Sequence, residues 1–387
     1  MSTWAPVTDE DFVALRHRLH AAPELAYEEH ETSALVAGYL REWGYEVETG
    51  IGRTGVVGTL RQGPGERSVA IRADMDALPI EETTGLAYAS RKPGVMHACG
   101  HDGHTTILLS AAQKLAASRQ FSGTLRVIFQ PAEENNSGAR TMIQDGLFER
   151  FPVDAVFGLH NWPGVPIGQF AFLDGPAMAS VDLVIIKIKG RGGHGAKPHQ
   201  TVDPVVVSAS LVMALQTLVS RNVDPLEMAV VTVGSIHGGN APNVIPDSVE
   251  LQLTVRTFNA EVREQLRHRL TALADAQAAS FGAKAEVYYP RGYPVLVNHP
   301  AETEFARQVA RRHFGDERID TSLKPITASE DFAFMLEQRP GSYLFLGNGD
   351  SADLHNSNYD FNDAILPDAA RYWVRLVEDY LAINVAA

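Results

Sequence analysis

Strand-like and helix-like segments alternate through the first half of the chain, and this alternation limits the folds it can adopt. Residues 67–72 (RSVAIR), 125–129 (LRVIF) and 155–159 (AVFGL) have the apolar character of buried strands, and residues 105–116 (TTILLSAAQKLA) that of a helix. Residues 28–43 predict an earlier helix, which Gly44 ends. Strands separated by helices predict an α/β fold, with a mixed, largely parallel sheet flanked by helices.

A different order of elements begins near residue 180. The pattern strand, helix, strand, strand, helix, strand predicts a ferredoxin-like α+β domain inserted at residues 180–292. Residues 1–179 and 293–387 would then form one discontinuous catalytic, metal-binding domain. The inserted domain would be a satellite that serves as a lid or a dimerisation surface.

Side chains that bind metals follow the predicted strands of the first domain. Asp74 and Asp76 come after residues 67–72, Glu133 and Glu134 after 125–129, and His160 after 155–159. In open α/β sheets, ligands bind outside the carboxyl ends of the strands, so these side chains are expected to converge.

The segment MHACGHDGHTT, residues 96–106, adds a thiol and imidazoles just before a predicted helix. It contains Cys99, the only cysteine of the chain, and His101. Each of these residues alone has a structural explanation, such as packing or capping, but their gathering at several strand ends argues against chance. Thiolate, imidazole and carboxylate together suit zinc, and also manganese, cobalt or nickel.

More than four candidate ligands indicate two ions, which can share a water molecule and lower its pKa towards neutrality. One carboxylate must remain off the metal to act as a base. Neighbouring side chains of an extended segment point in opposite directions, so one of Glu133 and Glu134 is expected to bind metal and the other to act as the base.

Two glycine-rich segments need separate interpretation. Gly50, Gly52 and Gly55 match G-x-G-x-x-G, but the strand-like VVGTL follows where a dinucleotide site needs a helix, so we expect hairpin glycines. The segment GRGGHGAKPH, residues 190–199, is either a flexible loop or a mobile carrier that brings His194 to a substrate oxygen.

Charge and composition exclude several classes of partner. Lys and Arg number 33 and Asp and Glu 47, which gives a net charge of −14 and disfavours nucleic acid and anionic membranes. A single cysteine excludes an internal disulfide, and the N-terminus has no apolar signal core. Apolar runs such as AVVTVG are too short to span a bilayer, so we expect a cytoplasmic protein without membrane partners.

Several motifs resemble those of one hydrolase family, and they occur in its order: RADMDALP (72–79), MHACGHDGHT (96–105), FQPAEE (129–134), GLHNWP (158–163), GRGGHGAKPH (190–199), NVIPD (243–247) and SEDFAFM (329–335). Over nearly all its length the chain resembles the hippurate hydrolase and auxin-conjugate hydrolase branch of the aminoacylase–carboxypeptidase metallohydrolases. The resemblance implies two divalent ions, with manganese or zinc ahead of cobalt or nickel. It implies Cys99 as the bridging ligand, with further ligands at His101, Glu134, His160 and His355.

The resemblance also implies roles for residues that do not bind metal. Glu133 matches the general base and Asp76 the carboxylate that orients the site. His194 matches a histidine that contacts the scissile carbonyl oxygen, and Asn243 a polar contact to the substrate. The family often forms dimers through the satellite domain, which predicts a homodimer or a higher homo-oligomer.

These features predict a metal-dependent amidohydrolase that cleaves small-molecule N-acyl amino acids, with benzoyl or acetyl as the acyl group. Glu133 would take the proton of the attacking water and pass it to the leaving nitrogen. A dipeptidase or exopeptidase and an N-acetyl-diaminopimelate deacetylase are alternatives within the enzyme class. A non-catalytic metal-binding protein on the same fold is the alternative from another class.

Overall fold

The computed structural model describes residues 7–383, except for the side chains of residues 135 and 136. The chain forms two compact units, which are described separately. Unit 1 comprises Met1–Gly175, Val297–Lys324 and Asp331–Ala387, and unit 2 comprises Pro176–Leu296 and Pro325–Glu330. The expected insertion, residues 180–292, lies within unit 2.

A mixed sheet forms the centre of unit 1. Its eight described strands lie in the order β1-β2-β4-β3-β5-β16-β6-β15. The central pairs β4–β3, β3–β5 and β5–β16 are parallel, whereas β1–β2, β2–β4 and β16–β6 are antiparallel, which confirms the predicted mixed sheet. The strands are β1 Glu46–Ile51, β2 Gly55–Gln62, β3 Ser68–Asp74, β4 Gly123–Gln130, β5 Ala155–Pro163, β6 Phe170–Ala171, β15 Ile319–Asp320 and β16 Gly341–Gly349.

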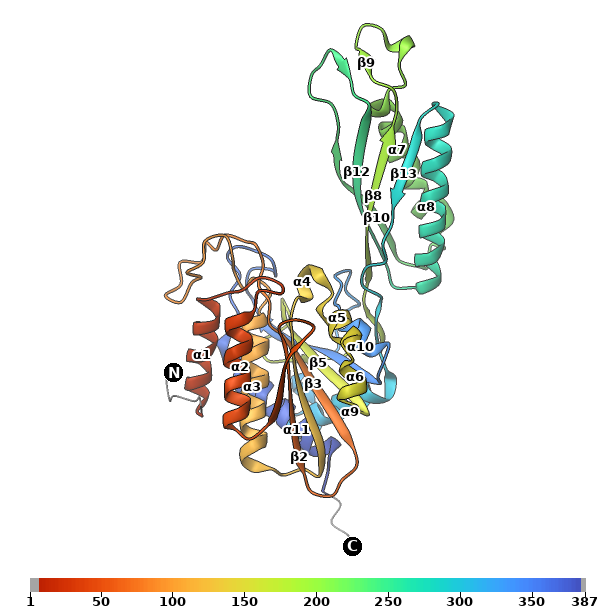
Figure 1. Cartoon of the computed structure of the whole chain (residues 1–387). Coiled ribbons are helices and arrows are strands. Elements are labelled where there is room, and N and C mark those ends of the chain that lie inside the picture. Colours follow the sequence, from red (N-terminus) through yellow and green to blue (C-terminus); the bar gives the residue numbers. More distant parts are fainter. Residues whose placement is uncertain (1–6, 384–387) are drawn as a thin grey trace. The chain divides into compact units, whose positions relative to one another are not determined.

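Helices flank this sheet, with α2 and α3 on one side and α5 and α6 on the other (Figure 1). The buried side of α11, which includes Trp373 and Leu376, joins the same core as α3. The helices of unit 1 are α1 Asp9–His20, α2 His30–Glu42, α3 His101–Ser118, α4 Glu133–Asn136, α5 Gly138–Gln144, α6 Leu147–Arg150, α9 Pro300–Phe314, α10 Ala333–Leu336 and α11 Leu366–Tyr380, with short 3₁₀ turns η2 Asp316–Arg318 and η3 Asp363–Ile365.

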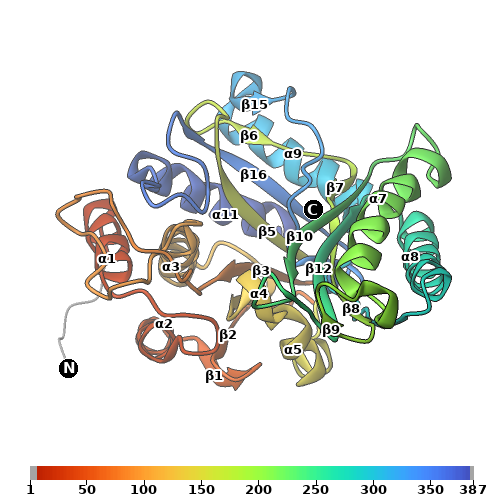
Figure 2. The same ribbon diagram turned by 90° about the horizontal axis from the view of Figure 1, so that it is seen from above.

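Unit 2 contains a four-stranded antiparallel sheet in the order β10-β12-β8-β13. With its helices the chain order is β8, α7, β10, β12, α8, β13, which is the predicted ferredoxin-like pattern. Alternate residues of β8 and β12 are buried, and α7 and α8 lie on that face of the sheet (Figure 2). The bounds are β8 Ser180–Lys189, α7 Pro204–Asn222, β10 Ala229–His237, β12 Ser248–Thr257, α8 Ala260–Ser280 and β13 Lys284–Tyr288.

Short elements complete the chain. A two-stranded ribbon of unit 2 pairs β9 with β11. The remaining bounds are β7 Gly175–Met178, β9 Gly193–His194, η1 Pro198–Gln200, β11 Val244–Ile245 and β14 Leu296–Asn298.

One helix in the part of the chain that the structure describes, α7, is long and apolar enough to cross a membrane by length and composition alone. Val207, Leu211, Leu215 and Leu218 of this helix are buried in the core of unit 2.

The glycines of the G-x-G-x-x-G segment form a hairpin, as predicted. β1 and β2 pair antiparallel on either side of the turn, where Gly50 and Gly52 have φ values of 83° and 63°. A side chain at Gly52 would also meet Met142 Cγ at 2.7 Å. These glycines therefore serve a tight, left-handed turn.

Candidate metal centre

Unit 1 brings the predicted metal ligands together, although they are far apart in the sequence. Ligand atoms of Cys99, His101 and His160 lie within 4.8 Å of one another, and so do those of Cys99, Glu134 and His355. Cys99 belongs to both groups, so its sulfur lies within 4.8 Å of a ligand atom of each of the other four residues.

Several secondary structure elements position these side chains. Cys99 directly precedes the αL residue Gly100, and His101 begins α3, four residues earlier than predicted. His160 lies within β5, which continues beyond the predicted strand end at residue 159. His355 has a left-handed backbone, with φ of 64°, and its N–H donates to Ala98 O at 2.8 Å. Such a conformation in a non-glycine residue is strained, and strain of this kind clusters at functional sites.

Hydrogen bonds determine which ring nitrogen of His101 is free for a cation. Its Nδ1 lies 2.9 Å from Asp76 O and 3.2 Å from Asp76 Oδ1, and both oxygens are acceptors. Nδ1 must therefore carry the proton, and Nε2 of the neutral ring carries the lone pair. A carboxylate or carbonyl that orients a histidine in this way is the usual second partner of a metal-binding imidazole.

His160 has the same arrangement. Its Nδ1 donates to Asn161 O at 2.7 Å, which leaves the lone pair on Nε2, 3.4 Å from Cys99 Sγ. Burial and the neighbouring His104 ring lower the pKa of His160 well below its usual value. The imidazole is therefore neutral near pH 7, as a metal ligand must be.

Two buried, unpaired polar atoms of these groups fit the binding of a cation. Among the described residues, His101 Nε2 and Glu134 Oε1 have no hydrogen-bond partner, and they face each other at 3.8 Å. Unpaired buried polar atoms are costly, and a divalent ion held between them would satisfy both. His355 Nε2 approaches the other oxygen of Glu134 at 3.3 Å.

The electrostatics of the site also favour cations. Burial opposes a charge on His101, but Asp74 and the other nearby carboxylates outweigh it and raise its pKa to about 10. Burial and the carboxylates of Glu134 and Glu133 raise the pKa of the Cys99 thiol well above its usual value. This surplus of negative charge would stabilise divalent cations, so the residues present fit a metal centre.

Glu133 lies beside the ligands, but not in the predicted backbone geometry. The segment after β4 was expected to be extended; instead Glu133 and Glu134 begin the short helix α4. A helical turn separates neighbouring side chains by about 100°, not by the 180° expected of an extended segment. Carboxylate oxygens of Glu133 and Glu134 lie within 4.8 Å of each other and of a ring nitrogen of His101. Glu133 Oε1 accepts a hydrogen bond from Asp331 N at 3.2 Å.

Asp76 connects the segment that carries Glu133 and Glu134 to the predicted metal ligand His101. Its two carboxylate oxygens accept from Glu133 N and Glu134 N, each at 3.0 Å, and one of them also contacts His101. Asp76 is 1% exposed, so these contacts take the place of water around its charge.

Sequence reasoning missed a buried network behind the ligands. Arg72 Nη1 donates to Asp74 Oδ2 at 2.6 Å, and Arg72 Nη2 donates to Asp331 Oδ1 at 3.1 Å. His104 lies between Asp74 and Asn161, and both of its ring nitrogens are in hydrogen bonds. The sequence signals for this network were the position of Arg72 and Asp74 near the end of a predicted strand and the motifs that contain His104 and Asp331, but none of them showed that these residues contact one another.

His194 and Asn243 belong to unit 2, where the structure brings them to the same ribbon. His194 lies on β9 opposite Val244 of β11, and Gly195 N donates to Asn243 O at 2.8 Å. Ala196 N donates to His194 Nδ1 at 3.0 Å. The neutral ring therefore carries its proton on Nε2, and the side chain is exposed.

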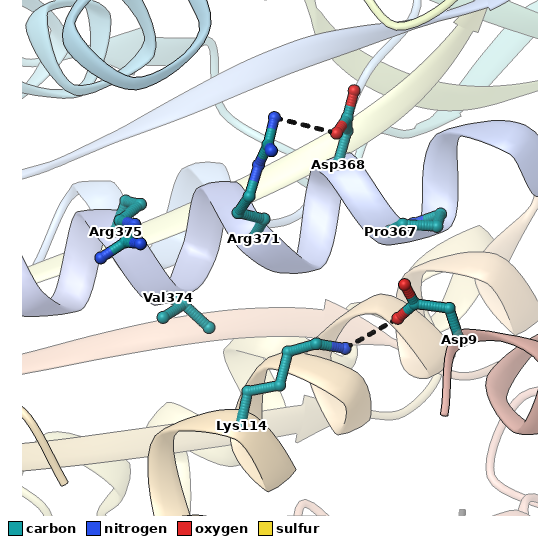
Figure 3. Close-up of a pocket in the computed structure, with 7 residues that line it drawn as sticks. All are labelled: Asp9, Lys114, Pro367, Asp368, Arg371, Val374 and Arg375. Atoms are coloured by element: carbon teal, nitrogen blue, oxygen red, sulfur yellow. Dashed lines mark hydrogen bonds and ion pairs between the residues drawn. The ribbon is translucent and has the colours of Figure 1, made fainter. Parts of the chain in front are cut away.

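A surface pocket of unit 1 of about 300 Å³ lies elsewhere, between residues of α1, α3 and α11 (Figure 3). Lys114 pairs with Asp9 at 2.9 Å, and Arg371 pairs with Asp368 at 3.1 Å. Its cations are thus already compensated by acids, so it does not compete with the metal centre as the functional site.

The match to known proteins decides the family. Residues 70–379 match Peptidase family M20/M25/M40, a stretch that contains every candidate ligand. The chain belongs to this family.

Its relatives include enzymes with defined names. The chain is 44% identical to the hippurate hydrolase of Campylobacter jejuni, over 96% of this chain and 97% of that protein. It is 42% identical to the N-acetyl-L-cysteine deacetylase of Bacillus subtilis (94% and 86%) and 38% identical to the IAA-amino acid hydrolase ILR1-like 4 of Arabidopsis thaliana (95% and 85%). A dinuclear metal-binding peptidase of the M20 family from Bacillus subtilis has a similar structure, with a TM-score of 0.83 and 33% identity over 96% of this chain and 98% of that one.

Proposed function

We propose that this M20 family protein is a metal-dependent amidohydrolase that cleaves N-acyl amino acids into a carboxylic acid and a free amino acid. The observation that carries the proposal is the pair of ligand groups that share Cys99, with Glu133 held beside them by Asp331 N. A protein that only stores metal needs no such positioned carboxylate. Three of its relatives are named as hydrolases or deacetylases of N-acyl amino acids.

We propose that Cys99, His101, Glu134, His160 and His355 would hold two divalent cations; Cys99 belongs to both ligand groups. When bound, the cations would polarise the scissile carbonyl and acidify a water molecule. Manganese or zinc is proposed, and cobalt or nickel would suit the same donors.

The chain's own side chains divide the remaining chemistry. Glu133 takes a proton from the attacking water and delivers it to the amide nitrogen as the C–N bond breaks. Asp76 holds His101 and the amides of the Glu133–Glu134 segment in place. His194 offers its Nε2–H to the carbonyl oxygen, and Asn243 contacts the polar part of the substrate.

Turnover of a substrate panel tests the function. The protein is treated with a chelator, reloaded with manganese, zinc, cobalt or nickel, and assayed with N-benzoyl and N-acetyl amino acids. We expect release of the free amino acid only after reloading. Metal-loaded protein that leaves every N-acyl amino acid intact would contradict the proposal.

A second candidate is peptide hydrolysis by the same site. The chain is 40% identical to thermostable carboxypeptidase 2 of Saccharolobus solfataricus, over 87% of this chain. Dipeptides and N-blocked peptides in the same panel distinguish the two candidates by their kcat/KM values.

We further propose a cytoplasmic homo-oligomer assembled through unit 2, with residues 180–292 as the satellite domain. Exposed apolar side chains on α7, in the loop that follows it and on the edge strand β10 support this proposal: Val205, Val206, Met213, Leu226 and Ile236. Unpaired strand edges of this kind are ready to pair with another chain.

A further inference from the structure

The carboxylate of Glu29, which neither the motifs nor the ligand set includes, holds the segment that carries Glu133 and Glu134. Glu29 precedes α2 and is 0% exposed. Its Oε1 accepts a hydrogen bond from Ala132 N at 2.9 Å, and its Oε2 accepts one from the Thr54 hydroxyl at 2.6 Å. A buried carboxylate needs such partners, and both of these are fixed by the fold.

Ala132 has a backbone that requires this support. Its φ is 54°, a left-handed conformation that is unfavourable for a residue with a side chain, and it directly precedes α4. Its carbonyl accepts from Gly138 N at 3.0 Å, so both its N–H and its C=O are held. A side chain at position 138 would collide with the Pro131 carbonyl oxygen, so this turn requires glycine at position 138.

Two carboxylates therefore bind three consecutive amides. Glu29 binds the N–H of residue 132, and Asp76 binds the N–H groups of Glu133 and Glu134. The direction in which α4 presents its two glutamates depends on all three hydrogen bonds.

We propose that Glu29 is a positioning residue of the metal centre, which acts through Ala132 to place Glu134 for metal binding and Glu133 for proton transfer. Only the expected changes in kcat and KM rest on the proposed function; the expected change in metal affinity does not. Residues that orient metal ligands typically change metal affinity or activity by about 10–100-fold when they are lost. A shift of the reacting groups by about 1 Å can cost about 10²-fold in rate.

The proposal requires the length and the acceptor atom of the side chain rather than its charge. A glutamine at position 29 keeps an oxygen for Ala132 N, and its amide can donate to the Thr54 oxygen. An aspartate keeps the charge but is one methylene shorter, so it cannot reach both partners. Burial is the main cause that raises the pKa of Glu29 to about 7, so the neutral form, which glutamine resembles, is accessible near neutral pH.

Glu24 provides a matched control on the same stretch of chain. It is also a buried carboxylate that accepts from two backbone amides, Glu31 N at 3.0 Å and Thr32 N at 2.9 Å. Those amides belong to the first turn of α2 and not to the segment that carries Glu133 and Glu134. Glu24→Ala therefore reports the effect of losing a buried, amide-binding carboxylate whose side chain does not contact the segment of Glu133 and Glu134.

The experiment compares Glu29→Ala, Glu29→Asp, Glu29→Gln and Glu24→Ala in the full chain. Manganese affinity is measured by competition with a chelator, unfolding by urea titration, and kcat and KM with whichever N-acyl amino acid the unmodified protein cleaves. For Glu29→Ala and Glu29→Asp we expect manganese affinity and kcat each to fall about 10–100-fold, with a smaller change in KM. Glu29→Gln should stay close to the unmodified protein, and Glu24→Ala should lose stability but keep its manganese affinity.

The aspartate variant keeps the test decisive if Glu29→Ala does not fold. Unchanged manganese affinity in a folded Glu29→Asp protein would overturn the proposal, and so would equal losses of affinity in the Glu29 and Glu24 variants. A protein that cleaves no N-acyl amino acid would refute the proposed function, but the affinity series would still decide the role of Glu29.

Discussion

At the scale of single residues, the hydrogen bonds of the ring nitrogens distinguish the proposed metal ligands His101 and His160 from His104. His101 and His160 each donate from Nδ1 to a fixed oxygen and so present the lone pair of Nε2. His104 has both ring nitrogens in hydrogen bonds, although it is just as buried. Residue type alone does not make this distinction, because it depends on what the second nitrogen contacts.

Glu133→Ala tests the division of labour within the glutamate pair. We expect turnover to fall by about 10²–10⁴-fold, the usual contribution of a general acid–base, while elemental analysis finds the metal content unchanged. Glu134→Ala is the control and should lose metal, because its Oε1 is one of the two unpaired atoms of the site. Retention of activity by Glu133→Ala would remove it as the base.

The pH dependence of the free energy of unfolding tests whether the buried carboxyl group of Glu29 titrates at its raised pKa. Burial raises the pKa of Glu29 to about 7, whereas a glutamate in the unfolded chain titrates near its ordinary value of 4.5. Between these values the folded state holds a proton that the unfolded state lacks, so this group lowers stability as the pH rises, by at most about 1.4 kcal/mol per pH unit. Urea unfolding from pH 4.5 to pH 8 should show the stability of Glu29→Gln, relative to the unmodified protein, increasing up to about pH 7. A constant difference would show that Glu29 does not titrate in this range.

At the scale of elements, the strand ends that carry metal-binding side chains could be predicted, because each combines an apolar run with a ligand residue. The start of α3 and the end of β5 were misplaced, since His101 and His160 are polar residues whose burial depends on the site itself. Glu29 was assigned to the first turn of the predicted helix 28–43, because a carboxylate that binds a distant amide looks in sequence like any surface acid. The helical start at Glu133 was missed for a similar reason: it follows the left-handed Ala132, which long-range hydrogen bonds stabilise.

Breaking the network at the end of β3 should destabilise the protein, because the buried carboxylates of Asp74 and Asp331 would lose the cation that Arg72 provides. Arg72 is 2% exposed and pairs with both Asp74 and Asp331. Removing one partner of a buried ion pair typically costs about 3–5 kcal/mol, so we expect Arg72→Met to lower the free energy of unfolding by that amount in urea titrations. Arg61→Met, at an exposed position of β2, is the control and should change it by less than about 0.5 kcal/mol. Equal free energies of unfolding for Arg72→Met and Arg61→Met would mean that loss of Arg72 from the network does not destabilise the protein.

At the scale of the whole molecule, the two edges of the unit 2 sheet differ in their exposed apolar surface. α7 packs against β10 and α8 against β13, the two edge strands. On the β10 side Met213 is 71% exposed and Leu226 95%. On the β13 side Tyr288 is 64% exposed, and Phe281, which follows α8, is 42% exposed. Exposed apolar surface of this kind marks association sites, so the β10 side is the expected contact between copies of the chain.

Met213→Glu tests this contact, because a charge buried without a partner in an apolar interface opposes association. We expect sedimentation and light scattering to show a dimer or larger oligomer for the unmodified chain, and a dissociation constant raised at least about tenfold for Met213→Glu. Phe281→Glu places the same charge beside α8 and should leave the oligomer intact. If Phe281→Glu dissociates the oligomer and Met213→Glu does not, the contact lies at the β13 edge instead. A monomeric unmodified chain would mean that the exposed apolar surface of α7 serves another purpose.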